Sequence, residues 1–241
     1  MITNILRRVR LTWLFFGFFI LYIVVAATLP EIKLDSAALT LFSVNSFLYG
    51  FYIAPILSAQ KARIEEMHKV VRSEANALFS IMLKTKSLPE GLRNDIQRLF
   101  VDYINAMVAG KGATQGEKRY EKIITFLLEY KGSQKEHTDK LLDAVVANQQ
   151  NRTMLNMHLR NKVYSNEWMI MAVLFSITLG FILMLDVGVS PLLITIKALL
   201  CTGLTMLIVI LAKLSTLTHK KAREIWNPLK NFNQSRFYRI D

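Results

Sequence analysis

The sequence has little of what most enzyme and metal sites are built from. Its single cysteine, Cys201, lies within an apolar run, so neither a disulfide nor a thiolate metal site can form inside one chain. The ten glycines are scattered and make no phosphate-binding loop. The four histidines, which form no i, i+4 pair and no HExxH motif, are His68, His137, His158 and His219. We therefore expect no catalytic residue, no metal site and no cofactor.

Long apolar runs, in contrast, are prominent, and 52% of the residues are hydrophobic. A membrane-spanning helix needs about 20 mostly apolar residues. Four runs approach or meet that length, in two hairpins: Leu11–Leu29, Ala37–Leu57, Trp168–Leu185 and Pro191–Leu214. They predict an N-terminal hairpin (1–57), an insert (58–165), a C-terminal hairpin (166–214) and a tail (215–241). Arginines before the first run also suit a signal peptide, but the run is too long and lacks a cleavage pattern.

The two short connections indicate the orientation of these spans. Residues 30–36 contain one lysine and two acids, and residues 186–190 contain no lysine or arginine. The positive-inside rule then places both connections outside, with both termini and the insert in the cytoplasm, at the inner (plasma) membrane. The net charge of +12 favours contact with anionic lipid headgroups over contact with nucleic acid.

The insert shows apolar residues at helical spacing. No glycine or proline occurs from Ser58 to Leu88, so the second span is expected to continue into the cytosol as one long helix, which Leu88–Gly91 ends. The next helix is expected to stop at Gly110–Gly112, and Thr114 and Glu117 have capping-box spacing. The last segment is expected to run from Gln134 into the third span without a break. These patterns predict an all-α membrane protein with four transmembrane helices and a helical cytosolic insert.

The second span is the most distinctive of the four. Small residues at spacings of three or four give it a face suited to close helix contact: Ser43, Ser46, Gly50, Ala54 and Ser58. Neighbouring positions are candidates for lining a conduction path: Asn45, Phe47, Phe51, Tyr52 and Ile56. The Asn45 amide could equally bridge two helices. Four spans leave little room for a pore in one chain, so transport would require several copies.

Basic residues near the membrane suggest further contacts. Lys61 and Arg63 follow the second span and could form a basic cytosolic mouth that concentrates anions. Lys197, inside the fourth span, could contact an anion, or instead reach outward or meet Asp186. The aromatic and basic tail, Glu224–Asp241, could lie on the membrane, but packing on the cytosolic body is favoured.

Short motifs in the insert resemble a known family. They are Arg72–Leu78, Leu88-Pro89 with Leu92-Arg93, Tyr103 within Phe100–Ile104, Asn151-Arg152 with Leu155, and Glu167-Trp168. In these, the chain resembles the bestrophin-like bacterial membrane proteins of unknown function. One departure is Ala109–Gly112, where that family often has an acidic residue followed by tryptophan.

The resemblance implies a ring of identical chains, five in number, with the second span around a central pore. Bestrophins are ligand-gated anion channels, so the resemblance implies an anion channel, with chloride as the first candidate ion. The acidic cluster of a bestrophin calcium clasp is not recognisable. The alternative is a non-conducting sensor or scaffold that binds a cytosolic partner through its insert.

Overall fold

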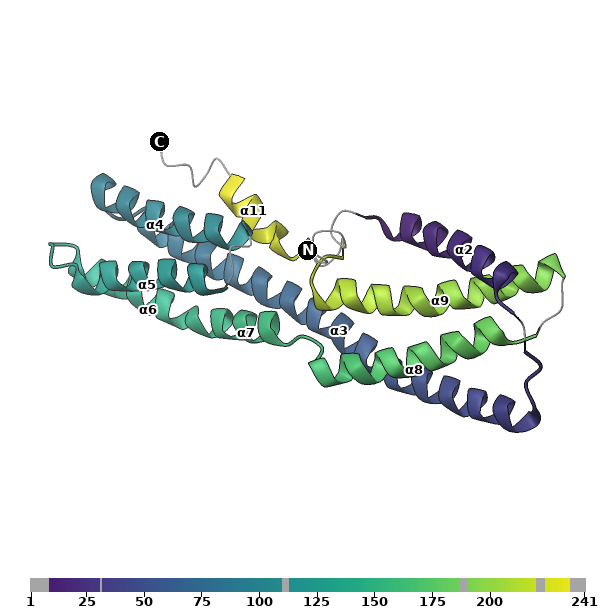
Figure 1. Ribbon diagram of the computed structural model, residues 1–241. Coiled ribbons are helices and arrows are strands. Elements are labelled where there is room, and N and C mark those ends of the chain that lie inside the picture. Colours follow the sequence, from purple (N-terminus) through teal and green to yellow (C-terminus); the bar gives the residue numbers. More distant parts are fainter. Residues whose placement is uncertain (1–8, 31, 110–112, 187–189, 220–223, 235–241) are drawn as a thin grey trace. The chain divides into compact units, whose positions relative to one another are not determined.

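The computed structural model describes residues 9–30, 32–109, 113–186, 190–219 and 224–234, and over these ranges the chain is helical, without a β-strand (Figure 1). The helices are α2 (Leu11–Thr28), α3 (Ser36–Thr85), α4 (Glu90–Val108), α5 (Ala113–Glu129), α6 (Lys135–Ala147), α7 (Gln149–Arg160), α8 (Ser165–Met184), α9 (Pro191–Ser215), the short 3-10 turn η1 (Glu224–Trp226) and α11 (Asn227–Gln234). The all-α prediction is confirmed for the described ranges.

Four helical stretches of the described chain are long and apolar enough to cross a membrane, as the four apolar runs predicted. They are α2, the apolar part of α3, the stretch that ends in α8, and α9. Many large apolar side chains on these helices are exposed, including Phe16, Leu41, Ile170 and Leu192. Apolar surface of this extent suits lipid or another protein chain rather than water.

The chain divides into two compact units. The apolar unit contains Met1–Ala62 and Lys162–Ala222, and the charged unit contains Arg63–Asn161 and Arg223–Asp241. Helix α3 contributes its first part to the apolar unit and its second part to the charged unit. The predicted continuation of the second span as one long helix is therefore confirmed.

In the apolar unit, α9 packs against both α2 and α8. A buried hydrogen bond of 2.7 Å joins the Tyr22 hydroxyl on α2 to Thr205 Oγ1 on α9. The two short connections also meet, because the Ile32 amide donates to the Met184 carbonyl (2.9 Å) and the Asp186 amide donates to the Ile32 carbonyl (3.2 Å). Both connections thus lie at the same end of the unit, which is compatible with the predicted orientation, and that orientation stays a prediction.

In the charged unit, α4 packs on α5, and α5 packs on α6. The side chains of Phe100, Ile104, Ile123 and Leu127 are completely buried between these helices. Pro89 precedes α4, so the predicted break between the second span's helix and its successor is confirmed. Helix α4 ends at Val108, and the predicted stop at Gly110–Gly112 lies outside the described residues.

The prediction of an unbroken helix from Gln134 into the third span is wrong. The helix is interrupted at Asn148, between α6 and α7, and again over Asn161–Tyr164, before α8 begins. At the second break the Arg63 side chain donates to the carbonyls of His158 (2.6 Å) and Leu159 (3.4 Å). Carbonyls in the last turn of a helix have no N–H donor within the helix, and here the Arg63 guanidinium is the donor.

The described part of the tail packs on the charged unit. Helix α11 lies on α4, and the side chains of Ile225 and Leu229 are fully buried. The predicted packing on the helical body is confirmed for residues 224–234, and residues 235–241 lie outside the described chain.

Candidate functional site

The five residues predicted to line a path occupy three different surroundings on α3. Asn45 is turned toward α8, where its amide nitrogen donates to the Leu174 carbonyl (3.1 Å) and to Thr178 Oγ1 (2.8 Å). This geometry is that of a polar bridge between two apolar helices. Within one chain, then, the Asn45 nitrogen serves the contact between α3 and α8.

Phe47 and Phe51 point away from the apolar unit. Each residue is 70% exposed, and their rings stack with centroids 6.0 Å apart. Four of the predicted small residues are exposed with them: Ser43, Gly50, Ala54 and Ser58. Helix α3 therefore presents a face of small residues and two stacked rings that no other described part of the chain covers.

Tyr52 and Ile56 are half-buried instead. They pack against a core cluster that includes Tyr49, Ile53 and Met171. In a single chain these two side chains help to hold the apolar unit together.

Pro55 lies inside α3 and is exposed. Proline has no N–H, so the Phe51 carbonyl cannot receive the usual helical hydrogen bond from residue 55. In a bilayer, a backbone carbonyl released in this way has to be satisfied by a neighbouring helix, a side chain or water. The exposed face of α3 therefore combines its two rings with a proline that removes one helical hydrogen bond.

The predicted basic residues also differ from one another. Lys61 is exposed, whereas Arg63 is buried against the end of α7, and burial lowers the pKa of its guanidinium. Lys197 is buried too, and its Nζ donates to the Leu185 carbonyl (3.0 Å) at the end of α8. A cation at that position satisfies a terminal carbonyl and the negative end of the helix dipole.

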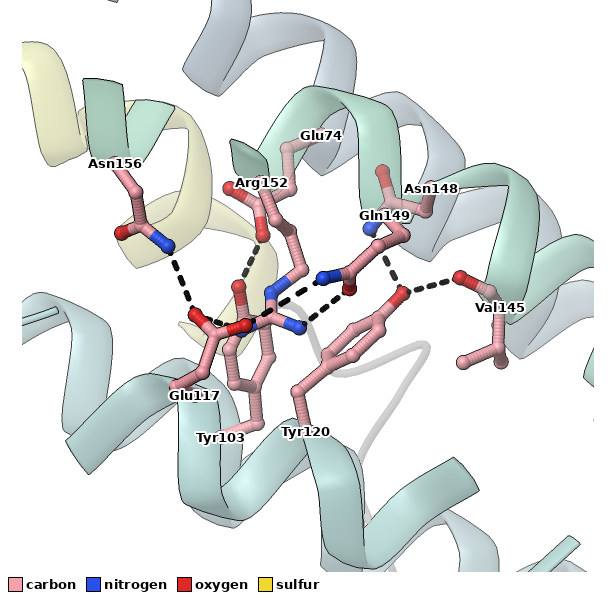
Figure 2. A network of polar contacts seen from close by, with 9 residues as sticks. All are labelled: Glu74, Tyr103, Glu117, Tyr120, Val145, Asn148, Gln149, Arg152 and Asn156. Atoms are coloured by element: carbon pink, nitrogen blue, oxygen red, sulfur yellow. Dashed lines mark hydrogen bonds and ion pairs between the residues drawn. The ribbon is translucent and has the colours of Figure 1, made fainter. Parts of the chain in front are cut away.

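A second polar site lies in the charged unit, where α3, α4, α5 and α7 contribute side chains to one network (Figure 2). Glu74 on α3 is fully buried, and its Oε1 accepts a short hydrogen bond from the Tyr103 hydroxyl on α4. Burial raises the pKa of both the Glu74 carboxyl and the Tyr103 phenol.

Arg152 on α7 is the cation of this network. It is buried, its Nη2 lies 3.0 Å from Glu117 Oε2, and its Nη1 donates to Gln149 Oε1 (2.9 Å). Its guanidinium carbon lies 3.8 Å from the centroid of the Tyr120 ring and 5.3 Å from that of Tyr103. Ion pairing, hydrogen bonding and contact with two aromatic rings thus hold one guanidinium.

Amide side chains complete the network. Asn156 donates to Glu117 Oε2 (2.8 Å), and Asn148 donates to the Tyr120 hydroxyl (3.1 Å), which in turn donates to the Val145 carbonyl (2.8 Å). Asn148 also sits at the junction of α6 and α7. The network therefore joins the α6–α7 junction to α5.

Sequence reasoning did not identify this network as a site. Glu74, Tyr103 and Arg152 all occur in the motifs that carry the resemblance, and the fold brings these distant positions together. Glu117 was interpreted as part of a capping box, yet its carboxylate pairs with Arg152. Among the residues that the structure describes, no group of three or more His, Cys, Asp and Glu side chains could hold a metal ion.

Comparison with known proteins places these features in a family. A family model for the bestrophin-like domain matches residues 11–219 of this chain. The chain belongs to the bestrophin-like family. No curated protein and no solved structure matches it. The matched range of this bestrophin-like chain includes the exposed face of α3 and the whole polar network, whereas α11 lies outside it. Membership agrees with the four apolar helices, and together they identify a membrane protein.

Proposed function

We propose that this bestrophin-like chain forms an oligomeric ion channel in which the exposed face of α3 lines or borders the conduction path. The observation that carries the proposal is that face itself, on which Phe47 and Phe51 are 70% exposed, small residues are exposed with them, and Pro55 lacks the N–H that would donate to the Phe51 carbonyl. Lipid cannot satisfy a free carbonyl, but pore water or an adjacent copy of the chain can.

The surroundings of the five α3 candidates suggest a division of roles. Phe47 and Phe51 would form the narrow part of the path, because they are exposed in the single chain. Tyr52 and Ile56 would support α3 from behind, since they pack on the core cluster. Asn45 would fix the distance between α3 and α8, and its side-chain oxygen, which only accepts hydrogen bonds, could contact pore water but not a passing anion.

The proposal extends to the assembly and the ion. Five copies around a central axis is the arrangement that the family suggests, in the plasma membrane with both termini and the charged unit in the cytoplasm. Anions, chloride first, suit a chain of net charge +12 with the exposed Lys61 following the apolar part of α3. Lys197 is a weaker candidate for an anion contact, because its ammonium group already donates to the Leu185 carbonyl.

Flux from liposomes tests the proposal. The purified chain should release chloride under a gradient, and Phe51→Ala should change the rate or the ion preference. Phe16→Ala is the matched control, because Phe16 is an exposed aromatic residue of α2 rather than α3 and its loss should leave the flux unchanged.

Size measurement by light scattering accompanies this experiment. A detergent-solubilised monomer would contradict the proposal, since one chain lacks room for a pore. An oligomer that passes no ion in either variant would favour the alternative, a non-conducting membrane sensor or scaffold.

A further inference from the structure

One buried oxygen in the charged unit has no partner. Glu74 is 0% exposed, and while its Oε1 accepts from Tyr103, its Oε2 has no hydrogen-bond partner among the described residues (Figure 2). A buried, ionised carboxylate oxygen without a hydrogen-bond partner strongly destabilises the folded state, because it has lost its hydrogen bonds to water and no protein donor replaces them. A buried carboxyl group in this position avoids the cost by keeping its proton.

The charges around Glu74 favour the same state. The titratable and charged groups that face it are Tyr103 from α4, Glu117 and Tyr120 from α5, and Arg152 from α7. Arg152 is already paired with Glu117 at 3.0 Å, so its positive charge is neutralised within the network. With Glu74 neutral, the charges of Arg152 and Glu117 cancel. An ionised Glu74 would leave a net negative charge in a buried cluster.

The influences on the pKa of the Glu74 carboxyl agree with this geometry. Burial is the largest influence on the Glu74 carboxyl and raises its pKa, and the nearby Glu117 raises it further. The hydrogen bond from Tyr103 and the charge of Arg152 act in the opposite direction without reversing the shift.

We propose that Glu74 is a proton-binding site, a carboxyl that is neutral in the folded charged unit and whose deprotonation loosens that unit. The ligand is the proton, and the site is the fully buried Glu74 carboxyl beside Tyr103 and Arg152. The proposal concerns the charged unit alone and does not depend on conduction through the membrane.

The direction of the pH dependence follows from linkage. Because the pKa of Glu74 is higher in the folded than in the unfolded chain, its contribution to stability is complete below the unfolded value of about 4.5. It is lost as the pH rises from there through the folded pKa. Across that window, the equilibrium constant for folding falls by up to about tenfold for each pH unit, the signature of one proton.

Infrared spectroscopy of the full chain in detergent detects the proton directly. The wild type at neutral pH should show the C=O stretching band of a protonated carboxylic acid, and the band should disappear as the pH is raised. The band should be absent from Glu74→Gln and retained in Glu66→Gln, a matched control on the same helix whose carboxylate is exposed and bonded to Lys69 (2.7 Å). Absence of the band from the wild type at neutral pH would overturn the proposal, and this result requires no variant to fold.

Two further measurements sharpen the test. Tyr103→Phe removes a hydrogen bond that lowers the pKa of Glu74, so loss of the band should move to higher pH. Thermal unfolding should show a loss of stability as the pH rises from about 4.5 in the wild type and in Glu66→Gln, and this loss should be absent from Glu74→Gln. An equal loss over the same pH range in Glu74→Gln, or a band that persists in that variant, would assign the effect to another group.

Discussion

Replacing Arg152 with alanine should be the most damaging single change in the charged unit. The substitution removes the partner of Glu117 and the hydrogen bond to Gln149, and it leaves the Tyr120 ring without the guanidinium that covers it. It also opens a cavity where a long side chain was almost completely buried. Two of these losses fall on α5 and one on α7, so the effect should extend over both helices.

The magnitude follows from how deeply each partner is buried. Removing one member of a buried ion pair costs about 3–5 kcal/mol. Here the Glu117 side chain is 32% exposed, so water can partly solvate the carboxylate that is left, and the lower end of about 3 kcal/mol is expected. For a chain of this size, that loss corresponds to a fall in Tm of roughly 6–12 °C.

Thermal unfolding of the purified chain in detergent measures this loss. Arg98→Ala is the matched control, because Arg98 is an exposed arginine of α4, and its removal should cost no more than about 0.5 kcal/mol. Adding Glu117→Gln to Arg152→Ala should recover part of the stability, because the abandoned carboxylate is then neutral. A Tm for Arg152→Ala equal to that of Arg98→Ala would refute the reasoning.

Three other changes give smaller effects of known sign. Arg63→Met should speed hydrogen exchange at the end of α7 and lower the free energy of unfolding by about 1.5–3 kcal/mol, because two hydrogen bonds to α7 carbonyls are lost. Lys61→Met should have neither effect, and equal exchange in both variants would contradict the capping role of Arg63. Leu217 has a φ of 55° just after α9, so Leu217→Gly should raise the free energy of unfolding by about 1 kcal/mol, and a fall in Tm would count against that strain. Tyr22→Phe and Thr205→Val should each lower the free energy of unfolding by about 1 kcal/mol, as measured by chemical denaturation, and the double variant should lose less than the sum of the two. Full additivity would mean that the hydrogen bond between Tyr22 and Thr205 contributes nothing to stability.

The sequence was sufficient for features that depend on local pattern. Span number followed from the length of apolar runs, and the shared end of the two connections followed from their lack of basic residues. The continuity of α3 followed from the absence of glycine and proline between Ser58 and Leu88. Each of these depends on residues that are close together in the chain.

Features that depend on distant residues were not predictable in the same way. The break before α8 depends on Arg63, which reaches the end of α7 from a different helix. Thr114 and Glu117 have the spacing of a helix cap, but the buried Arg152 competes for the Glu117 carboxylate and pairs with it. The two interpretations of Asn45 could not be separated until α8 was found beside it. Local spacing carries no information about which helix will lie opposite a side chain.

The pairing of α2 with α9 has a consequence for how the chain is made. Helix α2 leaves the ribosome early, but the Tyr22 hydroxyl can bond to Thr205, and the Val9 carbonyl to Lys213, only after residues 63–161 of the charged unit have been synthesised. The backbone hydrogen bonds of Ile32 to Met184 and Asp186 likewise form only after α8 has been synthesised. The first hairpin can therefore make these contacts only once α8 and α9 have been synthesised, so the apolar unit is completed after translation of α9 rather than one hairpin at a time.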